Sequence, residues 1–304
     1  DFVRELTRKC FVNGIRIKNV QHLSKKNGRN AIVFQARTVG RSCVAAKKVV
    51  PVLTEVLRSG YYPDDSNRRI INEEYHQYIF IQEDRFKLLS GVARMNKGKS
   101  HFNGDNFLIS RLECGKAIAA IADGMGSGKR AYIESRMVIE LMENCIDAGF
   151  DEKASIDLIN SAYIAGGGTG NPVTMDMSVI DCQSGYMHCM KLGAVSTFIR
   201  RDKWVEIIQS TTLPMGVLEQ VDYDCTTKKL YDGDYIVMVS DGVLDNIPCV
   251  NKEERMAQMI HALTIREPSA MAEKLLEQSL AYNDMKASDD CTVLVLGLFD
   301  TYEK

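Results

Sequence analysis

The sequence predicts an α+β fold in which a small α/β module precedes a larger layered domain. After about residue 87, the expected order is strands, two helices, many strands, two helices and one strand. This order suits antiparallel sheets with helices on their faces better than a parallel βαβ sheet. Before that point, short strand and helix patterns alternate with turn residues. We therefore predict two domains, at residues 1–86 and 87–304.

Three segments define the expected N-terminal module. "NAIVFQART" (30–38) and "YHQYIFIQE" (75–83) have the composition of strands, and 45–58 has the pattern of a helix. The stretch 59–69 between the last two contains Gly60, Pro63 and Asp64, which interrupt both periodicities.

The expected second domain begins with three strands, "LSGVARMNKG" (89–98), "DNFLISRLE" (105–113) and "KAIAAIAD" (116–123). A helix at 132–147 should place Ile133, Met137, Leu141 and Cys145 on one face. Gly149 then favours a helix end, and Asp151 caps a helix at 152–164. Strands follow between 173 and 239, helices at 251–264 and 268–282, and a last strand at 291–299. Four glycines in "AGGGTGNP" (165–172) predict a mobile surface loop.

Composition indicates a soluble globular chain, with 45% hydrophobic and 26% charged residues. No apolar run approaches the roughly 18 residues of a membrane span. The nine cysteines are odd in number and form no CxxC pair, which favours reduced thiols in a cytosolic compartment. The first 50 residues hold twelve Lys/Arg and two Asp/Glu, so they are strongly basic. A basic segment can contact nucleic acid or an anionic membrane, but a solvated face explains it equally well.

The stretch "AAIADGMGSGKRA" (119–131) resembles a phosphate-binding loop but fails its spacing. The loop G-x-x-x-x-G-K-S/T would need a glycine where Asp123 stands and a hydroxyl where Arg130 stands. The alternative is a buried strand that carries a carboxylate to its end. Gly124 follows at once, and a glycine lets the backbone approach another group closely.

Other acidic residues stand at the ends of apolar strands in the same way. Asp105 begins one strand, Asp241 follows "YIVMVS", and Asp289 and Asp290 precede "CTVLVL". Converging carboxylates without His or Cys suit hard cations such as Mg²⁺ or Mn²⁺. The sequence therefore predicts a divalent-metal site built from several strand ends.

Together these motifs resemble the metal-dependent serine/threonine protein phosphatases of the PP2C class, and within it the stage II sporulation protein E family. The likeness follows the order "GVARMNKGKSHFNGDNF", "IADGMGSGKRA", "NPVTMDMSVIDC", "MKLGAVSTFIRR", "TLPMGV", "MVSDGV" and "SDDCTVLVL". It implies an αββα sandwich of two antiparallel sheets flanked by helices, with a dinuclear metal site at one edge. The module at 1–86 would be the end of a regulatory region.

The resemblance also implies the ligands of two Mn²⁺ or Mg²⁺ ions. Asp123 should bridge both ions and so position the nucleophilic water. The Gly124 carbonyl and Asp105 should serve one ion, and Asp241 and Asp289 the other. Asp290 matches a second acidic residue of the motif and is the weaker candidate ligand.

Side chains near the predicted site are candidates for contact with substrate. Lys129, Arg130 and His101 are close in sequence to the metal motifs, although an exposed helical turn and a loop histidine explain them as well. Arg94 could hold phosphate if its side chain faces the site. Asp176 is better explained as a buried, paired residue than as a partner of a metal ligand.

The family implies a protein serine phosphatase that acts on a phosphorylated anti-anti-sigma factor and so controls sigma-factor activation in sporulation. It implies a homodimer, no nucleic-acid partner, and a position at the cytoplasmic face of a membrane through an N-terminal anchor outside this fragment. The alternatives are a stress-response phosphatase of the same family and an inactive regulatory pseudophosphatase. Separately, only a few residues join Gly124 to the helix pair at about 128–164, so we predict that a shift of these helices would move the Gly124 carbonyl and switch metal affinity.

Overall fold

The computed structural model describes residues 2–24, 29–98, 100–112, 115–126, 128–165, 171–202 and 204–301. These residues form two compact units. One contains the described residues up to Arg85 with Gly115 and Thr301, and the other contains the remaining residues from Phe86 to Asp300. Most of the predicted glycine-rich loop, 166–170, lies outside the described residues.

The first unit is a four-stranded antiparallel sheet, in the order β1-β2-β6-β4, with two helices packed on it. Its helices and strands are α1 (Phe2–Val12), β1 (Ile15–Leu23), β2 (Ala31–Thr38), β3 (Val44–Ala45), η1 (Ala46–Val49), α2 (Val50–Leu57), β4 (Tyr61–Pro63), β5 (Ile70–Ile71) and β6 (His76–Gln82). Leu6 of α1 and Leu53 of α2 meet Phe34 and Phe80 of the sheet, whose rings are stacked with centroids 5.4 Å apart.

The helix predicted at 45–58 is shorter in the structure. Residues 44 and 45 form a short strand, a 3₁₀ turn follows, and α2 begins only at Val50. Pro51 lies in the first turn of α2, where its missing N–H costs no hydrogen bond. We made no prediction for α1 and β1.

The second unit contains two five-stranded sheets, in the orders β14-β11-β10-β9-β8 and β13-β12-β15-β16-β7. The strands are β7 (Phe86–Met95), β8 (Asp105–Arg111), β9 (Lys116–Gly124), β10 (Val173–Asp181), β11 (Tyr186–Leu192), β12 (Thr197–Arg201), β13 (Trp204–Ile208), β14 (Asp224–Lys229), β15 (Tyr235–Val239) and β16 (Cys291–Asp300). All pairings within both sheets are antiparallel.

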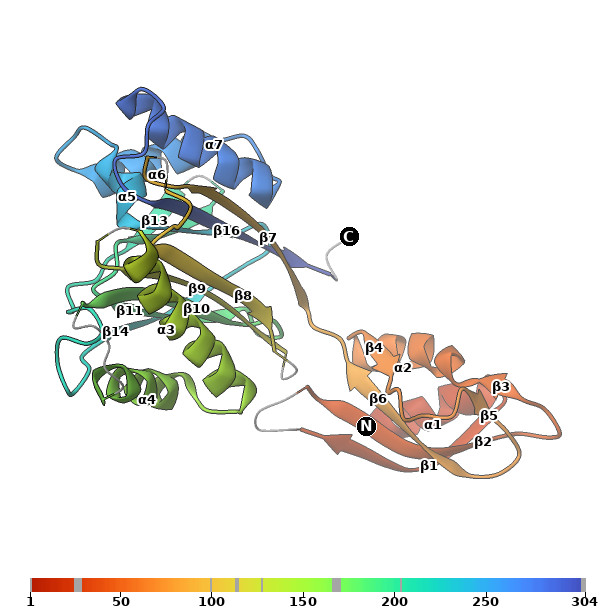
Figure 1. Cartoon of the computed structure of the whole chain (residues 1–304). Helices are drawn as coiled ribbons and strands as arrows, with labels where there is room; N and C mark the ends of the chain where they lie inside the picture. The colour runs from red at the N-terminus through yellow and green to blue at the C-terminus, as the bar shows by residue number, and fades with distance from the viewer. Residues whose placement is uncertain are drawn as a thin grey trace. The chain divides into compact units, whose positions relative to one another are not determined.

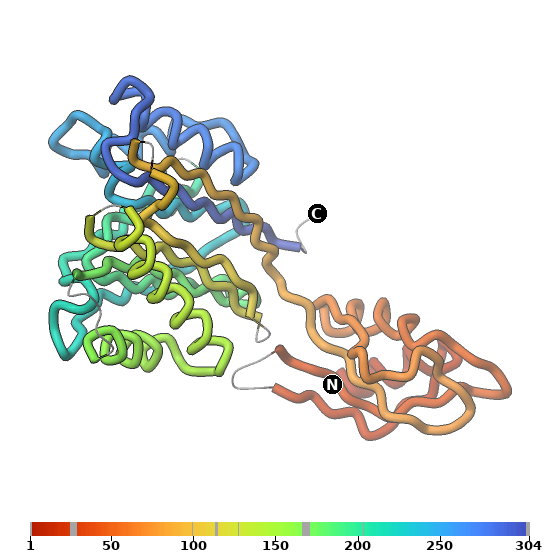
Figure 2. The backbone as a smooth tube through the Cα atoms, in the orientation of Figure 1, coloured from red at the N-terminus to blue at the C-terminus, as the bar shows by residue number. Residues whose placement is uncertain are grey.

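Helices cover the outer face of each sheet (Figure 1). They are α3 (Lys129–Asp147), α4 (Glu152–Ala165), α5 (Asp241–Asp245), α6 (Lys252–Ala262) and α7 (Pro268–Leu280). The first two pack on β8–β11 and the last three on the other sheet. A third apolar cluster, with Ile121 and Leu294 among its members, fills the space between the sheets. The trace in Figure 2 shows the resulting layers, and the predicted αββα sandwich is confirmed.

Of the four residues predicted on the buried face of α3, Cys145 is buried and Met137 and Leu141 pack against the core, but Ile133 does not. Ile133 is 53% exposed, whereas Ala131, Ser135, Val138 and Met142 are buried. The prediction fails at the start of the helix because Ala131 and Ser135 are the buried residues there, and Ile133 lies on the other side of that turn. The prediction that Asp151 caps α4 is confirmed, because the Ala154 amide donates to Asp151 Oδ1 at 2.8 Å.

Within the described part of the chain, no helix is long and apolar enough to cross a bilayer.

We predict that Gly91→Ala destabilises the second unit. A Cβ at Gly91 in β7 would lie 2.2 Å from the Ser269 backbone nitrogen in α7, so the helix would have to move. Overpacking of this kind costs about 1–3 kcal/mol. Urea unfolding should show a lower midpoint for Gly91→Ala, while Ser90→Ala on the same strand should leave it unchanged. Equal midpoints for Gly91→Ala and the parent chain would contradict this packing.

Candidate metal centre

Two of the predicted ligands face each other on neighbouring strands. Asp105 at the start of β8 is the register partner of Asp123 near the end of β9. Directly opposed side chains on antiparallel strands have Cβ atoms about 4.5–5.5 Å apart. The alternation along β9 places Asp123 on the same face as Ile121, which belongs to the core between the sheets. The pair therefore lies at the edge of the sandwich, on its inner side.

The other two predicted ligands come from the second sheet. Asp241 is the first residue of α5, directly after β15, and Asp289 lies just before β16. The Ser240 amide donates to the Thr292 carbonyl at 3.0 Å, and the Thr292 amide donates to Ser240 Oγ at 2.9 Å. These bonds hold the end of β15 beside the start of β16, and so place Asp241 near Asp289.

Glycine is needed at two of these strand ends. A Cβ on Gly124 would lie 2.4 Å from the carbonyl oxygen of Ala131 in α3. A Cβ on Gly242 would lie 2.1 Å from the carbonyl oxygen of Asp290. Each aspartate is therefore followed by a glycine whose backbone lies in close contact with another segment. Gly124 contacts α3, and Gly242 contacts the turn at residues 289–290, so both segments adjoin the acidic site.

The carboxylates are poorly compensated. Asp105 is fully buried, and among the described residues neither of its carboxylate oxygens has a hydrogen-bond partner of good geometry. The hydroxyls of Thr292 and Ser240 are nevertheless near enough to favour its ionised form. Burial outweighs them and raises the pKa of Asp105 to about 7.

The neighbouring aspartates raise one another's pKa values. Burial, and then the charges of Asp105 and Asp241, raise the pKa of Asp123 to about 10. Asp241 lies at the exposed rim. Partial desolvation still raises its pKa, followed by the charges of Asp245 and Asp289. Like charges this close favour either a bound proton or a bound cation.

The donor set fits hard divalent cations. It consists of carboxylate oxygens and a strand-end backbone, which are the ligands of Mg²⁺ and Mn²⁺. In the described residues, no three His, Cys, Asp or Glu side chains are already drawn together as a ligand cluster. Of the four aspartates, Asp123 and Asp241 line one cavity between the sheets. The buried Asp105, with its unpartnered oxygens, is the strongest sign of a missing positive charge.

Asp290 has a different environment from the other acidic residues. Its Oδ1 accepts from the Lys97 amide at 2.8 Å, and its Oδ2 accepts from the Gly104 amide at 2.7 Å. Both oxygens thus anchor the connection between β7 and β8. Asp289 Oδ1 accepts from the Asp290 amide at 2.9 Å and lies 3.4 Å from Lys97 Nζ, a lysine for which we made no prediction.

The predicted substrate contacts lie at the surface. Lys129 and Arg130 are exposed in the first turn of α3, and Arg130 Nε lies 3.3 Å from Glu134 Oε1. His101 is exposed in the connection between β7 and β8. Arg94 is turned toward the acidic site, where it donates to the Asp105 carbonyl and, at 3.3 Å, to Thr292 Oγ1.

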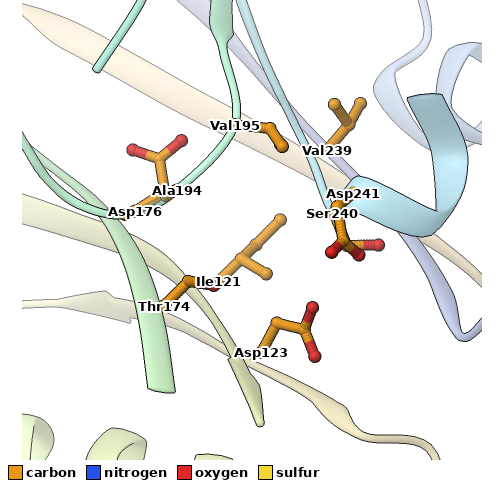
Figure 3. Close-up of a pocket in the computed structure, with 10 residues that line it drawn as sticks. Ile121, Asp123, Thr174, Asp176, Ala194, Val195, Val239, Ser240 and Asp241 are labelled. Carbon is orange, nitrogen blue, oxygen red and sulfur yellow. The ribbon is translucent and has the colours of Figure 1, made fainter. Parts of the chain in front are cut away.

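A cavity of about 40 Å³ lies beside the aspartates, between the sheets. Its lining includes Asp123, Asp176, Val195 and Asp241 (Figure 3). In that view, the Asp123 side chain points toward Asp241. Asp176 is buried and paired, as predicted, but its partner Lys191 was not predicted, because strands separated by a turn give no local signal of such a pair.

The two-sheet sandwich with acidic residues at one edge of both sheets defines a domain of the PP2C phosphatase class. A solved structure described as the PP2C phosphatase domain and a fragment of the regulatory domain of SpoIIE from Bacillus subtilis matches with a TM-score of 0.75 and 27% identity. The match covers 99% of this chain and 88% of that one.

The chain belongs to the stage II sporulation protein E (SpoIIE) family, whose model matches residues 114–299. Stage II sporulation protein E of Bacillus subtilis (strain 168) is 29% identical over 286 residues, which cover 94% of this chain and 34% of that protein. Its namesake from Priestia megaterium is 30% identical over 253 residues, 83% of this chain and 43% of that protein. The chain thus spans less than half the length of either curated relative.

We predict that the metal-free protein loses stability as pH rises. Asp105 and Asp123 have raised pKa values, so the folded chain holds protons that the unfolded chain releases above about pH 4. Each such proton lowers the free energy of unfolding by up to about 1.4 kcal/mol per pH unit. For Asp105 this loss ends near pH 7, and for Asp123 near pH 10.

Urea unfolding in EDTA between pH 5 and 7 measures this dependence. Asp105→Asn should have a flatter profile than the parent chain, and Asp157→Asn, on an exposed position of α4, should have the same profile as the parent. A steeper loss of stability in Asp105→Asn would show that the charge of this residue is compensated in the metal-free fold.

Proposed function

We propose that this chain is a Mn²⁺- or Mg²⁺-dependent protein serine phosphatase. The observation that carries the proposal is the opposed pair Asp105 and Asp123, in which a fully buried carboxylate lacks a hydrogen-bond partner among the described residues. Such a pair is costly to bury without a cation. Membership of the SpoIIE family and the match to a PP2C phosphatase domain support the same activity.

In this proposal, Asp123 would be shared between two cations. Asp105 and the Gly124 carbonyl would hold one, and Asp241 and Asp289 would hold the other. When bound, a pair of divalent cations makes water acidic enough to serve as a nucleophile near neutral pH and neutralises the charge of a phosphate group. The chain would contribute the arrangement, because carboxylates from both sheets meet at one edge of the sandwich.

Basic side chains around the rim would receive a phosphoprotein. Lys97 is half-exposed and adjacent to Asp289, so its ammonium group is placed to attract a phosphate group. Lys129, Arg130 and His101 are exposed on the neighbouring segments and would contact the protein around the phosphoserine. Arg94 is held by backbone and hydroxyl acceptors, which favours a role in orienting the Asp105 strand over direct contact with substrate.

We infer the biological context from the family. The substrate would be a phosphoserine on an anti-anti-sigma factor, whose dephosphorylation activates a sigma factor in sporulation. Residues 1–86 would be the end of a regulatory region and 87–304 the phosphatase, acting as a homodimer at the cytoplasmic face of a membrane to which a further N-terminal segment anchors it. The close packing of Gly124 on Ala131 supports a role of α3 in setting metal affinity.

Asp123→Asn should remove phosphatase activity while preserving the fold. The substitution removes the one negative charge that both cations would share and leaves the side-chain volume almost unchanged. Replacing a residue that only orients a metal ligand lowers metal affinity or activity about 10–100-fold. Asp123 is itself a proposed ligand, so we expect activity to fall by more than about 100-fold. The test is Mn²⁺-dependent hydrolysis of an aryl phosphate and of the phosphorylated anti-anti-sigma factor, with circular dichroism as the control for folding.

Full activity of folded Asp123→Asn would contradict the assignment. An inactive parent chain that still binds the phosphoprotein would instead favour a regulatory pseudophosphatase. Activity on a stress-response substrate but not on the sporulation substrate would favour a stress-response phosphatase of the same family.

Asp289→Asn should reduce activity more than Asp290→Asn. Asp289 is proposed to hold a cation, whereas both oxygens of Asp290 are occupied by backbone amides. Asp290→Asn should instead lower the unfolding midpoint, because the NH₂ group that replaces one carboxylate oxygen cannot accept a hydrogen bond from the backbone amide that faces it. Activity at saturating Mn²⁺ and thermal unfolding of both variants give the comparison, and the reverse order of activities would exchange the two roles.

A further inference from the structure

A buried ion pair lies one step inside the sandwich from the proposed metal ligands. Asp176 on β10 and Lys191 on β11 are register partners, with Lys191 Nζ 2.5 Å from Asp176 Oδ2. Their exposed fractions are 2% and 1%. Thr174, two residues before Asp176, is the register partner of Asp123, so the ion pair and the metal ligand lie in adjacent rows of the same sheet face.

The ion pair connects the two sheets. Lys191 Nζ also donates to the Val195 carbonyl at 2.7 Å and to Thr197 Oγ1 at 2.8 Å, and Thr197 Oγ1 donates to Asp176. Asp176 and Lys191 belong to the sheet that carries Asp105 and Asp123, whereas Thr197 is the first residue of β12 in the other sheet. The ammonium group thus has three acceptors: Asp176 in its own sheet, Val195 in the connection between β11 and β12, and Thr197 in the other sheet.

This connection adjoins the metal site. Asp176 and Val195 line the same cavity as Asp123 and Asp241 (Figure 3). The ligands proposed for the two cations come from both sheets, so the cations can be held only if the separation of the sheets at this edge is right. Coordination bonds are about 2.0–2.6 Å long and tolerate small errors poorly.

Stability alone does not account for a buried ion pair here. Replacing such a pair by apolar residues of similar volume is often neutral or stabilising. An apolar layer, however, has no preferred hydrogen-bond geometry, whereas the ammonium group fixes the direction and length of three contacts. The network of Asp176, Lys191 and Thr197 therefore has a property that the surrounding core lacks: it sets one spacing between the sheets.

We infer that Asp176, Lys191 and Thr197 are positioning residues of the metal centre, which hold the two sheets at the separation that lets Asp123 and Asp241 share a cation. The inference rests on the proposed metal-dependent function. It predicts that removing the network without destabilising the fold weakens metal binding.

The experiment compares Mn²⁺ binding by the full chain, freed of metal, with that of the Asp176→Leu/Lys191→Met double variant, by isothermal titration calorimetry and by the thermal unfolding midpoint. The double variant replaces the ion pair by an apolar pair of similar size, so its metal-free midpoint should not fall. Its Mn²⁺ dissociation constant should rise about 10–100-fold, the range found when residues that orient metal ligands are removed. The rise in midpoint on adding Mn²⁺ should shrink accordingly.

Two further variants make the result decisive. Arg201→Met breaks the ion pair of Arg201 and Asp234, at the far end of β12, and should leave the Mn²⁺ dissociation constant unchanged. Thr197→Val keeps the Asp176–Lys191 pair and removes only the hydroxyl through which the second sheet contacts that pair. It should also weaken Mn²⁺ binding, and it decides the question if the double variant does not fold.

The outcomes separate the two claims. If the parent chain binds no Mn²⁺, both the proposed metal centre and the inference that rests on it are contradicted. If the parent chain binds Mn²⁺ and the folded double variant, or Thr197→Val in its place, binds equally tightly, the network is ordinary core and the inference alone is overturned. Weakening by Arg201→Met of the same size would likewise overturn it, because general destabilisation would then explain the effect.

Discussion

Repulsion among carboxylates at one edge of the sandwich is the constraint on which the rest of the second unit depends. Asp105 and Asp123 face each other on adjacent strands, and Asp241 and Asp289 approach from the other sheet. Burial and mutual charge raise the pKa of Asp105 and of Asp123 well above the usual range. The fold must hold these groups together although they repel, and two sheets with separate helical layers supply the necessary packing.

Close approach of the backbone is the second requirement of this edge. Gly124 lets the end of β9 contact the first turns of α3, and Gly242 lets the start of α5 contact the turn that carries Asp289. Any larger residue would separate these elements and displace the aspartate beside it. The repeated aspartate-glycine pair therefore has a structural reason: one residue supplies charge, and the next admits the neighbouring element.

The sequence predicted the parts of this arrangement that have local signals. Apolar strands ending in aspartate, and glycine directly after Asp123 and Asp241, indicated the acidic edge, and the resemblance indicated the sandwich, which the structure confirms. On α3, Cys145 is buried as predicted, but Ile133 was placed wrongly, because Ala131 and Ser135 are buried at the start of the helix where periodicity favours a large apolar residue. The link between Lys191 and Thr197 had no signal, since it depends on two sheets meeting. The roles of the individual ligands stay predictions.

Anomalous scattering from crystals grown with Mn²⁺ tests the central claim most directly. The account predicts two manganese peaks at the sheet edge, with Asp123 contacting both, Asp105 and the Gly124 carbonyl contacting one, and Asp241 and Asp289 the other. A single peak that Asp123 does not contact, or manganese bound only elsewhere on the chain while the four aspartates stay apart, would contradict it.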